Sequence, residues 1–274
     1  MIELTNARAE RVKAVRSLSG RPVRSRTGRF LVEGPQGVRE LVRHAPGSVR
    51  DVYLTGAAAA RYTEIVDAAR EARLHVHLAS DDVLHAMSPD AQGVLAVADQ
   101  RVASLKDTLR AGARLVAVLL NVRDPGNAGT VIRAADAAGA DAVVLAGESV
   151  DIFNPKTVRS TAGSLFHLPV VTGQAFPELV DALHDAGLGV LAADGVGPHD
   201  LDDLLDVAGT APAAAPDLSL PTAWVFGNEA WGLRAEDRAR ADAVVRVPIR
   251  GRAESLNLAT AATVCLYASS RAQR

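Results

Sequence analysis

The 274-residue chain has one cysteine, few aromatic residues and no long hydrophobic run. One thiol cannot form an internal disulfide, and Cys265 lies in an apolar segment, so we expect it to be a small core residue. No apolar run reaches the roughly 18 residues that a membrane-spanning helix needs. Charged residues occupy the N-terminus, where a signal peptide has its apolar region. We therefore expect a cytoplasmic protein.

The chain also lacks a strong overall charge, because its formal net charge is only −2. This value excludes a wholly polybasic protein, but the cations are unevenly distributed. The first 30 residues contain Arg8, Arg11, Lys13, Arg16, Arg21, Arg24, Arg26 and Arg29, against Glu3 and Glu10. Such a block is typical both of phosphate-binding segments and of solvated or frayed arms. Arg21, Arg24 and Arg26 are the candidates for phosphate contact in this block.

Alternating helical and strand patterns divide the chain into two α/β domains, at residues 1–104 and 105–274. In the first, a helix over residues 6–18 is followed by a basic, glycine-punctuated loop up to Gly28. The second begins, after a linking helix, with the apolar strand Leu115–Leu120. Strands that alternate with helices predict a parallel sheet covered on both faces. Ligands of such sheets bind at the carboxyl ends of the strands.

The first loop of interest contains Asp124-Pro125-Gly126-Asn127. This composition is typical of a tight turn, and we expect Gly129 or Thr130 to open the following helix. A simple turn leaves Asn127 and Arg133 unexplained. They are six residues apart, so a long arginine side chain can reach back towards the loop. A guanidinium near a helix entrance can clamp phosphate or carboxylate.

A second loop holds Glu229 between Gly227 and Gly232. The glycines allow a ligand to approach the backbone closely. The carboxylate could hold a ribose hydroxyl or an amine, or pair with Arg133, although a solvated loop acid is the commoner fate of a single glutamate. Trp231 in the same loop is either a stacking surface or a cover for the core.

A third loop places Glu254, Ser255 and Asn257 between Gly251 and a small-residue helix that runs to about Ser270. Serine and asparagine are good N-cap residues, so a capped helix start explains one of the three. It does not explain all of them. Free backbone N–H groups at such an entrance can bind a ligand.

Together, these loops resemble the three ordered motifs of the SpoU (TrmH) family, RNA ribose 2′-O-methyltransferases of the SPOUT class. The matching stretches are Asn127-x-Gly129-x-x-x-Arg133-x-Ala135, Phe226-Gly227-Asn228-Glu229-x-x-Gly232-Leu233 and Ile249-x-Gly251-x-x-Glu254-Ser255-Leu256-Asn257. The resemblance covers the whole second domain. Phe30-Leu31-Val32-Glu33-Gly34 resembles part of the ribosomal-protein-like substrate-binding domain that precedes it in many members.

The resemblance implies an α/β fold with a parallel sheet and a C-terminal trefoil knot, homodimerisation through the knot, and S-adenosylmethionine as cofactor. The implied cofactor-binding residues are Phe226, Gly227, Asn228, Gly232, Ile249, Leu256 and Leu258. Arg133 would act on the ribose 2′-hydroxyl. The residues that would position it or the nucleotide are Asn127, Glu229, Ser255 and Asn257.

The resemblance further implies that Arg159 holds RNA phosphate and that no metal is required. It also makes RNA the expected ligand of Arg21, Arg24 and Arg26. His75 and His77 are two residues apart on an expected strand and lack obvious further ligands nearby, so we expect a surface pair.

A guanidinium has a pKa above about 12 and is a poor base, so Arg133 needs assistance to remove the proton from the ribose hydroxyl.

Three functions remain to be weighed. An S-adenosylmethionine-dependent 2′-O-methyltransferase acting on ribosomal RNA accounts for all three motifs, with transfer RNA as the alternative substrate. A nucleotide-dependent oxidoreductase would need a G-x-G-x-x-G loop after its first strand, which is missing. A non-catalytic RNA-binding protein leaves the motifs without a purpose. The motifs do not distinguish housekeeping modification from antibiotic resistance.

Overall fold

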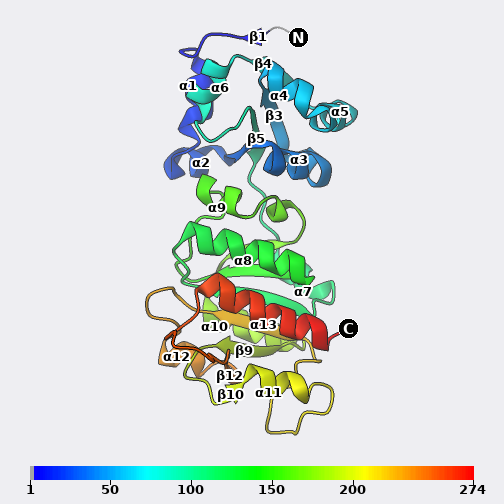
Figure 1. The fold of residues 1–274 in the computed structure, drawn as a ribbon, viewed down its shortest axis with the longest axis vertical. Coiled ribbons are helices and arrows are strands. Elements are labelled where there is room, and N and C mark those ends of the chain that lie inside the picture. Colours follow the sequence, from blue (N-terminus) through cyan, green and yellow to red (C-terminus); the bar gives the residue numbers. More distant parts are fainter. Residues whose placement is uncertain (1–2) are drawn as a thin grey trace. The chain divides into compact units, whose positions relative to one another are not determined.

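The computed structural model describes residues 3–274, which form two compact units (Figure 1). One unit runs to Arg101 and also contains Asp151–His167; the other comprises Val102–Val150 and Leu168–Arg274. Residues 151–167 therefore pack with the first unit, although the sequence division at residue 104 assigned them to the second. Within residues 3–274, no helix is both long and apolar enough to cross a membrane.

The first unit is built on a five-stranded mixed sheet in the order β1-β4-β3-β5-β2. The strands β1, β4 and β3 run parallel, whereas β5 is antiparallel to both β3 and β2. Its elements are β1 (Glu3–Leu4), α1 (Glu10–Ser17), α2 (Arg21–Thr27), β2 (Arg29–Glu33), α3 (Pro35–His44), η1 (Pro46–Ser48), β3 (Val49–Leu54), α4 (Gly56–Arg61), α5 (Thr63–Glu71), β4 (Val76–Ala79), α6 (Asp81–Met87), β5 (Val94–Asp99), α9 (Pro155–Ser160) and η2 (Ser164–Phe166).

Apolar side chains at helical spacing hold α1 and α6 on this sheet. Val12, Val15 and Leu18 are all buried in a core with the α6 side chains and with strand residues such as Leu31. Burying a side chain of this size contributes about 2 kcal/mol. The prediction of a basic loop up to Gly28 is wrong in part, because Arg21–Thr27 forms the helix α2. This helix ends at Gly28, which has a left-handed conformation.

His77 is not the surface residue that the strand pattern predicted. Its Nε2 lies 2.7 Å from Asp51 Oδ1, and its ring stacks on Tyr53 with centroids 5.0 Å apart. His75 is exposed and precedes β4. Burial raises the pKa of the Tyr53 hydroxyl to about 12, and the neighbouring Asp51 adds to the rise. The two histidines therefore do not form a pair.

The second unit contains a seven-stranded sheet in the order β10-β12-β9-β11-β6-β7-β8, with all its pairings parallel. Its elements are α7 (Leu105–Arg110), β6 (Leu115–Leu120), α8 (Pro125–Ala138), β7 (Ala142–Ala146), β8 (Val170–Gln174), α10 (Phe176–Asp185), β9 (Gly189–Ala193), β10 (His199–Asp200), α11 (Leu201–Asp206), β11 (Thr222–Phe226), α12 (Ala235–Arg238), β12 (Ala243–Arg246) and α13 (Leu258–Ala272).

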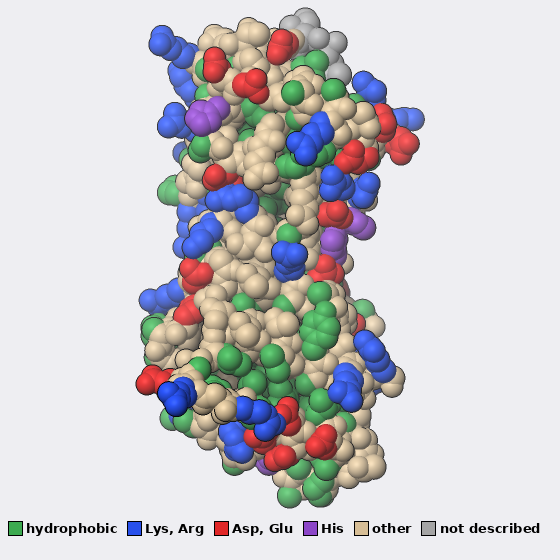
Figure 2. Space-filling model, viewed as in Figure 1, with side chains coloured by type: hydrophobic (Ala, Val, Ile, Leu, Met, Phe, Trp, Pro, Cys, Tyr) green, Lys and Arg blue, Asp and Glu red, His purple; other side chains and the backbone are tan. Residues whose placement is uncertain are grey.

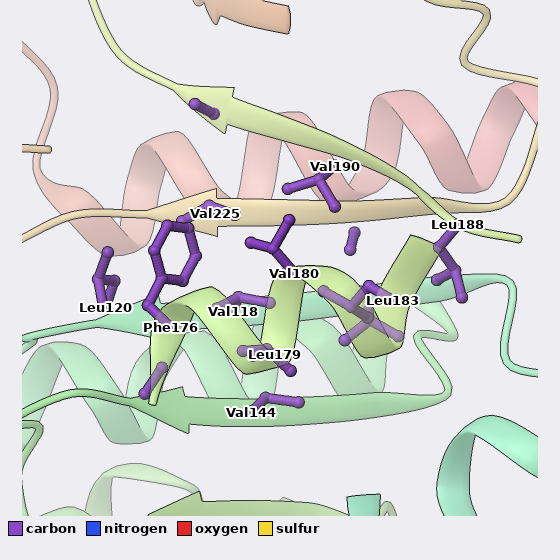
Figure 3. Packing of buried hydrophobic residues seen from close by; sticks show 14 of the residues in the cluster. Val118, Leu120, Val144, Phe176, Leu179, Val180, Leu183, Leu188, Val190 and Val225 are labelled. Atoms are coloured by element: carbon purple, nitrogen blue, oxygen red, sulfur yellow. The ribbon is translucent and has the colours of Figure 1, made fainter. Parts of the chain in front are cut away.

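Both faces of this sheet are buried, as the continuous apolar strands predicted. Alternate strand residues such as Val118, Val144 and Val225 point towards α10, where they pack against Leu179 and Leu183 (Figure 3). The intervening residues face the other side, on which α8 and α13 pack against each other (Figure 1). A strand buried on both faces has no polar side, which is why its sequence shows no alternation.

Two buried side chains secure α13 to the sheet. The Trp224 Nε1 donates a hydrogen bond of 2.9 Å to Ser269 Oγ, so the indole is buried with its polar atom satisfied. Cys265 is fully buried, as expected, and burial raises the pKa of its thiol to about 12. The thiol is therefore a core group rather than a nucleophile.

The helix α8 begins earlier than the sequence suggested. It starts at Pro125 rather than at Gly129 or Thr130, and the Asp124 carboxylate accepts a hydrogen bond of 2.7 Å from the Asn127 backbone N–H. Proline is favoured at this position because a first-turn N–H has no intrahelical partner. As a result, Asn127 lies inside the first helical turn.

The most consequential difference in the first unit concerns Arg24. Its side chain is only 2% exposed; it pairs with Asp151 at 2.7 Å and donates to the carbonyl oxygens of Leu18 and Ser19. In this arrangement the Arg24 guanidinium is not available for the phosphate contact expected from the sequence, because it is buried among three internal acceptors. Arg24 instead joins α2 to the segment that begins at Asp151.

We expect Arg24→Met to destabilise the first unit by about 3 kcal/mol, because the substitution leaves the Asp151 carboxylate and two carbonyl groups without their donor. Thermal unfolding of the full chain, followed by circular dichroism, measures the change. Arg21→Met, at an exposed position of the same helix, is the matched control and should melt like the wild type. Equal melting temperatures for the two variants would contradict this role for Arg24.

Candidate active site

A cavity of about 480 Å³ opens in the second unit where β9, β11 and β12 end. Parallel strands bring their carboxyl ends to one edge of a sheet, so the loops after them converge there. The walls come from residues 193–195, residues 226–232 and the stretch leading into α13. The loops of the second and third motifs therefore meet at this edge, whereas none of the described residues of the first motif loop lines the cavity.

All of the predicted cofactor-binding residues line this cavity: Phe226, Gly227, Asn228, Gly232, Ile249, Leu256 and Leu258. Three predicted catalytic residues, Glu229, Ser255 and Asn257, line it as well. The wall thus combines exposed apolar side chains, including Ile249 and Leu256, with carboxylate, hydroxyl and amide groups. Such a mixture suits a ligand that has both apolar and polar parts.

The loop after β11 is closed by a pair of backbone hydrogen bonds. Asn228 N–H donates to Gly232 O at 3.0 Å, and Gly232 N–H donates to Asn228 O at 2.9 Å. A Cβ on Gly227 would lie 2.4 Å from the carbonyl carbon of Gly232. Backbone atoms cannot move away as a flexible side chain can, so only glycine fits at position 227.

The Asn228 side chain is used inside the protein. Its Nδ2 donates to the Asn121 carbonyl oxygen at 2.7 Å, and its Oδ1 accepts from the Ala230 N–H at 2.9 Å. Asn121, directly after β6, has a φ of 56°, which asparagine tolerates better than most residues. These contacts tie the second motif loop to the first.

Glu229 connects the same two loops more directly. Its carboxylate accepts hydrogen bonds from the backbone N–H groups of Arg123 at 3.2 Å and Asp124 at 3.0 Å, and from Asn127 Nδ2 at 3.4 Å. A carboxylate at a helix N-terminus also meets the positive end of the helix dipole. The glutamate is therefore a structural anchor as well as a wall of the cavity.

Asn257 caps the helix that follows its loop and also contacts the first motif loop. Its Oδ1 caps α13 by accepting from the N–H groups of Ala259 and Thr260, and its Nδ2 donates to Asn127 Oδ1 at 3.1 Å. A chain of polar contacts thus runs from Glu229 through Asn127 to Asn257. Ser255 is exposed in the same wall.

Arg133 stands apart from this network. It is exposed on α8, and a helical rise of about 1.5 Å per residue puts its Cα roughly 9 Å along the axis from Asn127. It does not line the cavity described above. Within residues 3–274 of a single chain, the predicted catalytic arginine is therefore not assembled with Asn127, Glu229 and Asn257.

The candidate RNA-binding residues of the first unit differ in their surroundings. Arg21 and Arg26 are exposed on α2. Arg159 forms ion pairs with Glu33 and, at 3.0 Å, with Asp90. It lines a cavity of about 640 Å³ within this unit. Because two carboxylates already balance its charge, Arg159 would have to exchange partners to bind a phosphate.

Two features of the site were missed from the sequence. Asp194 follows β9, lines the cavity, and is held by Arg238 Nη1 at 3.1 Å. The Arg123 guanidinium lies over the Trp231 ring, 5.5 Å from its centroid, and Trp231 is 47% exposed. The rule that ligand groups follow parallel strands could have identified Asp194, whereas the stacked pair depends on loop geometry.

The family comparison matches the chain to two models. The SpoU rRNA Methylase family matches residues 114–267, which is more than half of the chain. The family described as RNA 2′-O ribose methyltransferase substrate binding matches residues 31–101. The resemblance proposed from the three motifs and from the first domain is therefore confirmed.

Similar proteins cover nearly the whole chain. A 23S rRNA (guanosine(2553)-2′-O)-methyltransferase of Bacillus subtilis is 34% identical over 97% of this chain and 98% of its own. A 23S rRNA (uridine(2479)-2′-O)-methyltransferase of Streptomyces viridochromogenes is 33% identical over 97% and 90%. Among solved structures, an AdoMet-bound rRNA methyltransferase from Sinorhizobium meliloti has a TM-score of 0.82 at 30% identity, covering 98% of this chain and 97% of that one.

We expect Gly227→Ala to weaken binding of S-adenosylmethionine by about tenfold or more, because the new Cβ forces the loop after β11 to open. Isothermal titration calorimetry on the full chain measures the affinity. Gly251→Ala is the control, since a Cβ there would have no heavy atom within 4 Å. If both variants bind like the wild type, the cavity is not the cofactor site.

Proposed function

The chain belongs to the SpoU rRNA methylase family, and from that premise we propose that it methylates a ribose 2′-hydroxyl of 23S ribosomal RNA with S-adenosylmethionine. The observation that carries this proposal is the cavity at the ends of β9, β11 and β12, bordered by the chain of contacts from Glu229 to Asn257. Relatives named as 23S rRNA 2′-O-methyltransferases match along nearly the whole chain, which supports the same RNA class.

The cavity suits this cofactor in size and chemistry. Its volume of about 480 Å³ is within the range of small-molecule sites. Gly227 lets the loop after β11 close on Gly232, because a Cβ at position 227 would clash with the Gly232 backbone. The carboxylates of Asp194, Glu229 and Glu254 line a site whose ligand carries positive charge on sulfur and nitrogen.

When bound, S-adenosylmethionine supplies an electrophilic methyl group on its sulfonium. The chain must hold the ribose 2′-oxygen in line with that methyl group, since orientation of this kind supplies a large part of the acceleration. We assign Glu229, Asn127 and Asn257 to fixing the two loops that shape the site. A guanidinium accepts a proton poorly, so we assign Arg133 to holding the ribose and its phosphate.

We further propose that the enzyme is a homodimer in which Arg133 completes the site of the partner subunit. The support is its exposed position on α8, which packs against α13, a helix with exposed apolar side chains. Val264 and Tyr267 on α13 are 39% and 46% exposed. Figure 2 shows hydrophobic side chains gathered over this part of the second unit. A second copy covering this surface would bury these side chains.

The trefoil knot and the cytoplasmic location are also proposals. After β12, at the far side of β9, the chain returns as α13 to pack on α8, β6 and β11. A knot of the SPOUT type requires a return of this kind. A ribosomal RNA substrate agrees with a cytoplasmic protein.

Methyl transfer from radiolabelled S-adenosylmethionine to RNA from a host lacking the gene tests the function. We expect label at one ribose 2′-oxygen of 23S rRNA, and the mapped nucleotide then distinguishes a housekeeping from a resistance modification. Label in transfer RNA would support the proposed reaction but would show that the substrate is transfer RNA instead of 23S rRNA. Cofactor binding without transfer to any RNA would favour the non-catalytic alternative.

Arg133→Ala should abolish transfer while leaving cofactor affinity unchanged, because Arg133 does not line the cavity. Mixing inactive Arg133→Ala and Glu229→Gln subunits tests whether sites are shared between subunits. A site that draws on both chains regains activity, since one site of the mixed dimer then has both wild-type residues. If the mixture stays inactive while mixed dimers are present, both residues act within one subunit.

Neutralising Arg21 and Arg26 should flatten the salt dependence of RNA binding, with the log–log slope falling by about 1.5 if each contacts one phosphate. Filter binding at several salt concentrations gives the slope. Arg61→Ala with Arg70→Ala removes the same charge from exposed positions on α4 and α5. An equal change in both double variants would mean that α2 has no specific contact.

A further inference from the structure

The first unit contains a cluster of three side chains outside the cavities described above. Glu40 and His44 lie four residues apart near the end of α3, so they share one helix face. His167 follows η2 in the segment that joins this unit after residue 150. One ligand atom from each residue lies within 4.8 Å of the other two.

The two distances from the Glu40 carboxylate to the histidines match ligand separations around a metal ion. Glu40 Oε2 lies 3.3 Å from His44 Nε2 and 3.2 Å from His167 Nε2. Zinc bonds to nitrogen and oxygen are about 2.0–2.1 Å long, which separates two ligands of a tetrahedron by about 3.3 Å. The imidazole rings of His44 and His167 meet edge to face with centroids 4.6 Å apart. The Nε2 atom of each ring therefore approaches the Glu40 carboxylate from its own direction.

The backbone around Gly163 packs closely against the Glu40 side chain and holds its carboxylate between the two histidines. Gly163 has a φ of 104°, and a Cβ there would lie 2.4 Å from Glu40 Cγ. Glycine therefore lets the 151–167 segment approach the glutamate closely, and the Glu40 side chain is only 19% exposed. His44 and His167 are more exposed, at 50% and 26%, which leaves a path for an ion from solvent.

We propose that Glu40, His44 and His167 bind a divalent transition-metal ion, with zinc as the best match. Two imidazoles and one carboxylate are a common zinc donor set, and water can take the fourth position. The ion would link residues 127 positions apart in the chain and hold the segment that carries Arg159. This role is separate from methyl transfer, for which the sequence implied no metal, and does not depend on the proposed activity.

The competing state of the cluster is an ion pair, in which the carboxylate accepts hydrogen bonds from the imidazoles. Both states use the same three side chains, but only one of them binds metal ions saturably. Calorimetric titration of the metal-free full chain with zinc chloride separates them. We expect one equivalent to bind, with a rise in melting temperature, because an ion that binds only the folded state stabilises it.

Substitutions identify the ligands. His44→Ala, His167→Ala and Glu40→Gln should each weaken zinc binding by about tenfold or more, since each removes one of three protein ligands. His184→Ala is the matched control, because His184 also pairs with a carboxylate, Asp242 at 3.0 Å, on an exposed helix end. Saturable binding that all four variants retain would overturn the assignment, as would its absence in the wild type.

A measurement on the wild type guards against variants that fail to fold. Cobalt-loaded wild-type chain should show the visible absorption of a tetrahedral site, and X-ray absorption of the zinc form should report two imidazoles and one carboxylate. A shell of oxygen ligands without imidazole would place the ion elsewhere and refute the proposal.

Discussion

The carboxylate of Glu229 is the contact on which the geometry of the site depends. It lies in the loop after β11 and accepts hydrogen bonds from two backbone N–H groups at the start of α8. Strands β11 and β6 are neighbours in the sheet, so one side chain can bridge the loops that follow them. Asn127 extends the bridge to Asn257, where α13 begins. Three segments far apart in sequence are thereby held around one cavity.

Several polar residues that line the cavity make structural contacts inside the protein. Asn257 caps α13 and contacts Asn127; Asn228 closes its own loop and binds the Asn121 carbonyl oxygen. Contacts of this kind are compatible with a ligand-binding role for the same residues. A side chain that is locked by internal hydrogen bonds presents its neighbours rigidly, and rigid presentation is what a binding site requires. Substitutions here should consequently be tested for folding as well as for activity.

The basic N-terminal region shows why charge alone does not assign a binding role. Arg21, Arg24 and Arg26 all lie on α2, yet Arg24 points inward to Asp151 whereas the other two are exposed. Arg159 is likewise engaged by Glu33 and Asp90. Helical geometry separates adjacent residues by about 100° around the axis, so neighbours in sequence have different surroundings. A count of cations cannot reveal which of them are already neutralised inside the protein.

The sequence by itself determined the class of fold, the family and most of the named residues of the cavity wall. Apolar strands alternating with helices predict a doubly covered parallel sheet. Only the tertiary structure decided that Arg24 is buried, that Arg133 lies away from the cavity, and that Glu40 and His44 meet His167. These facts depend on contacts between residues distant in sequence, and local propensity and spacing carry no information about such contacts.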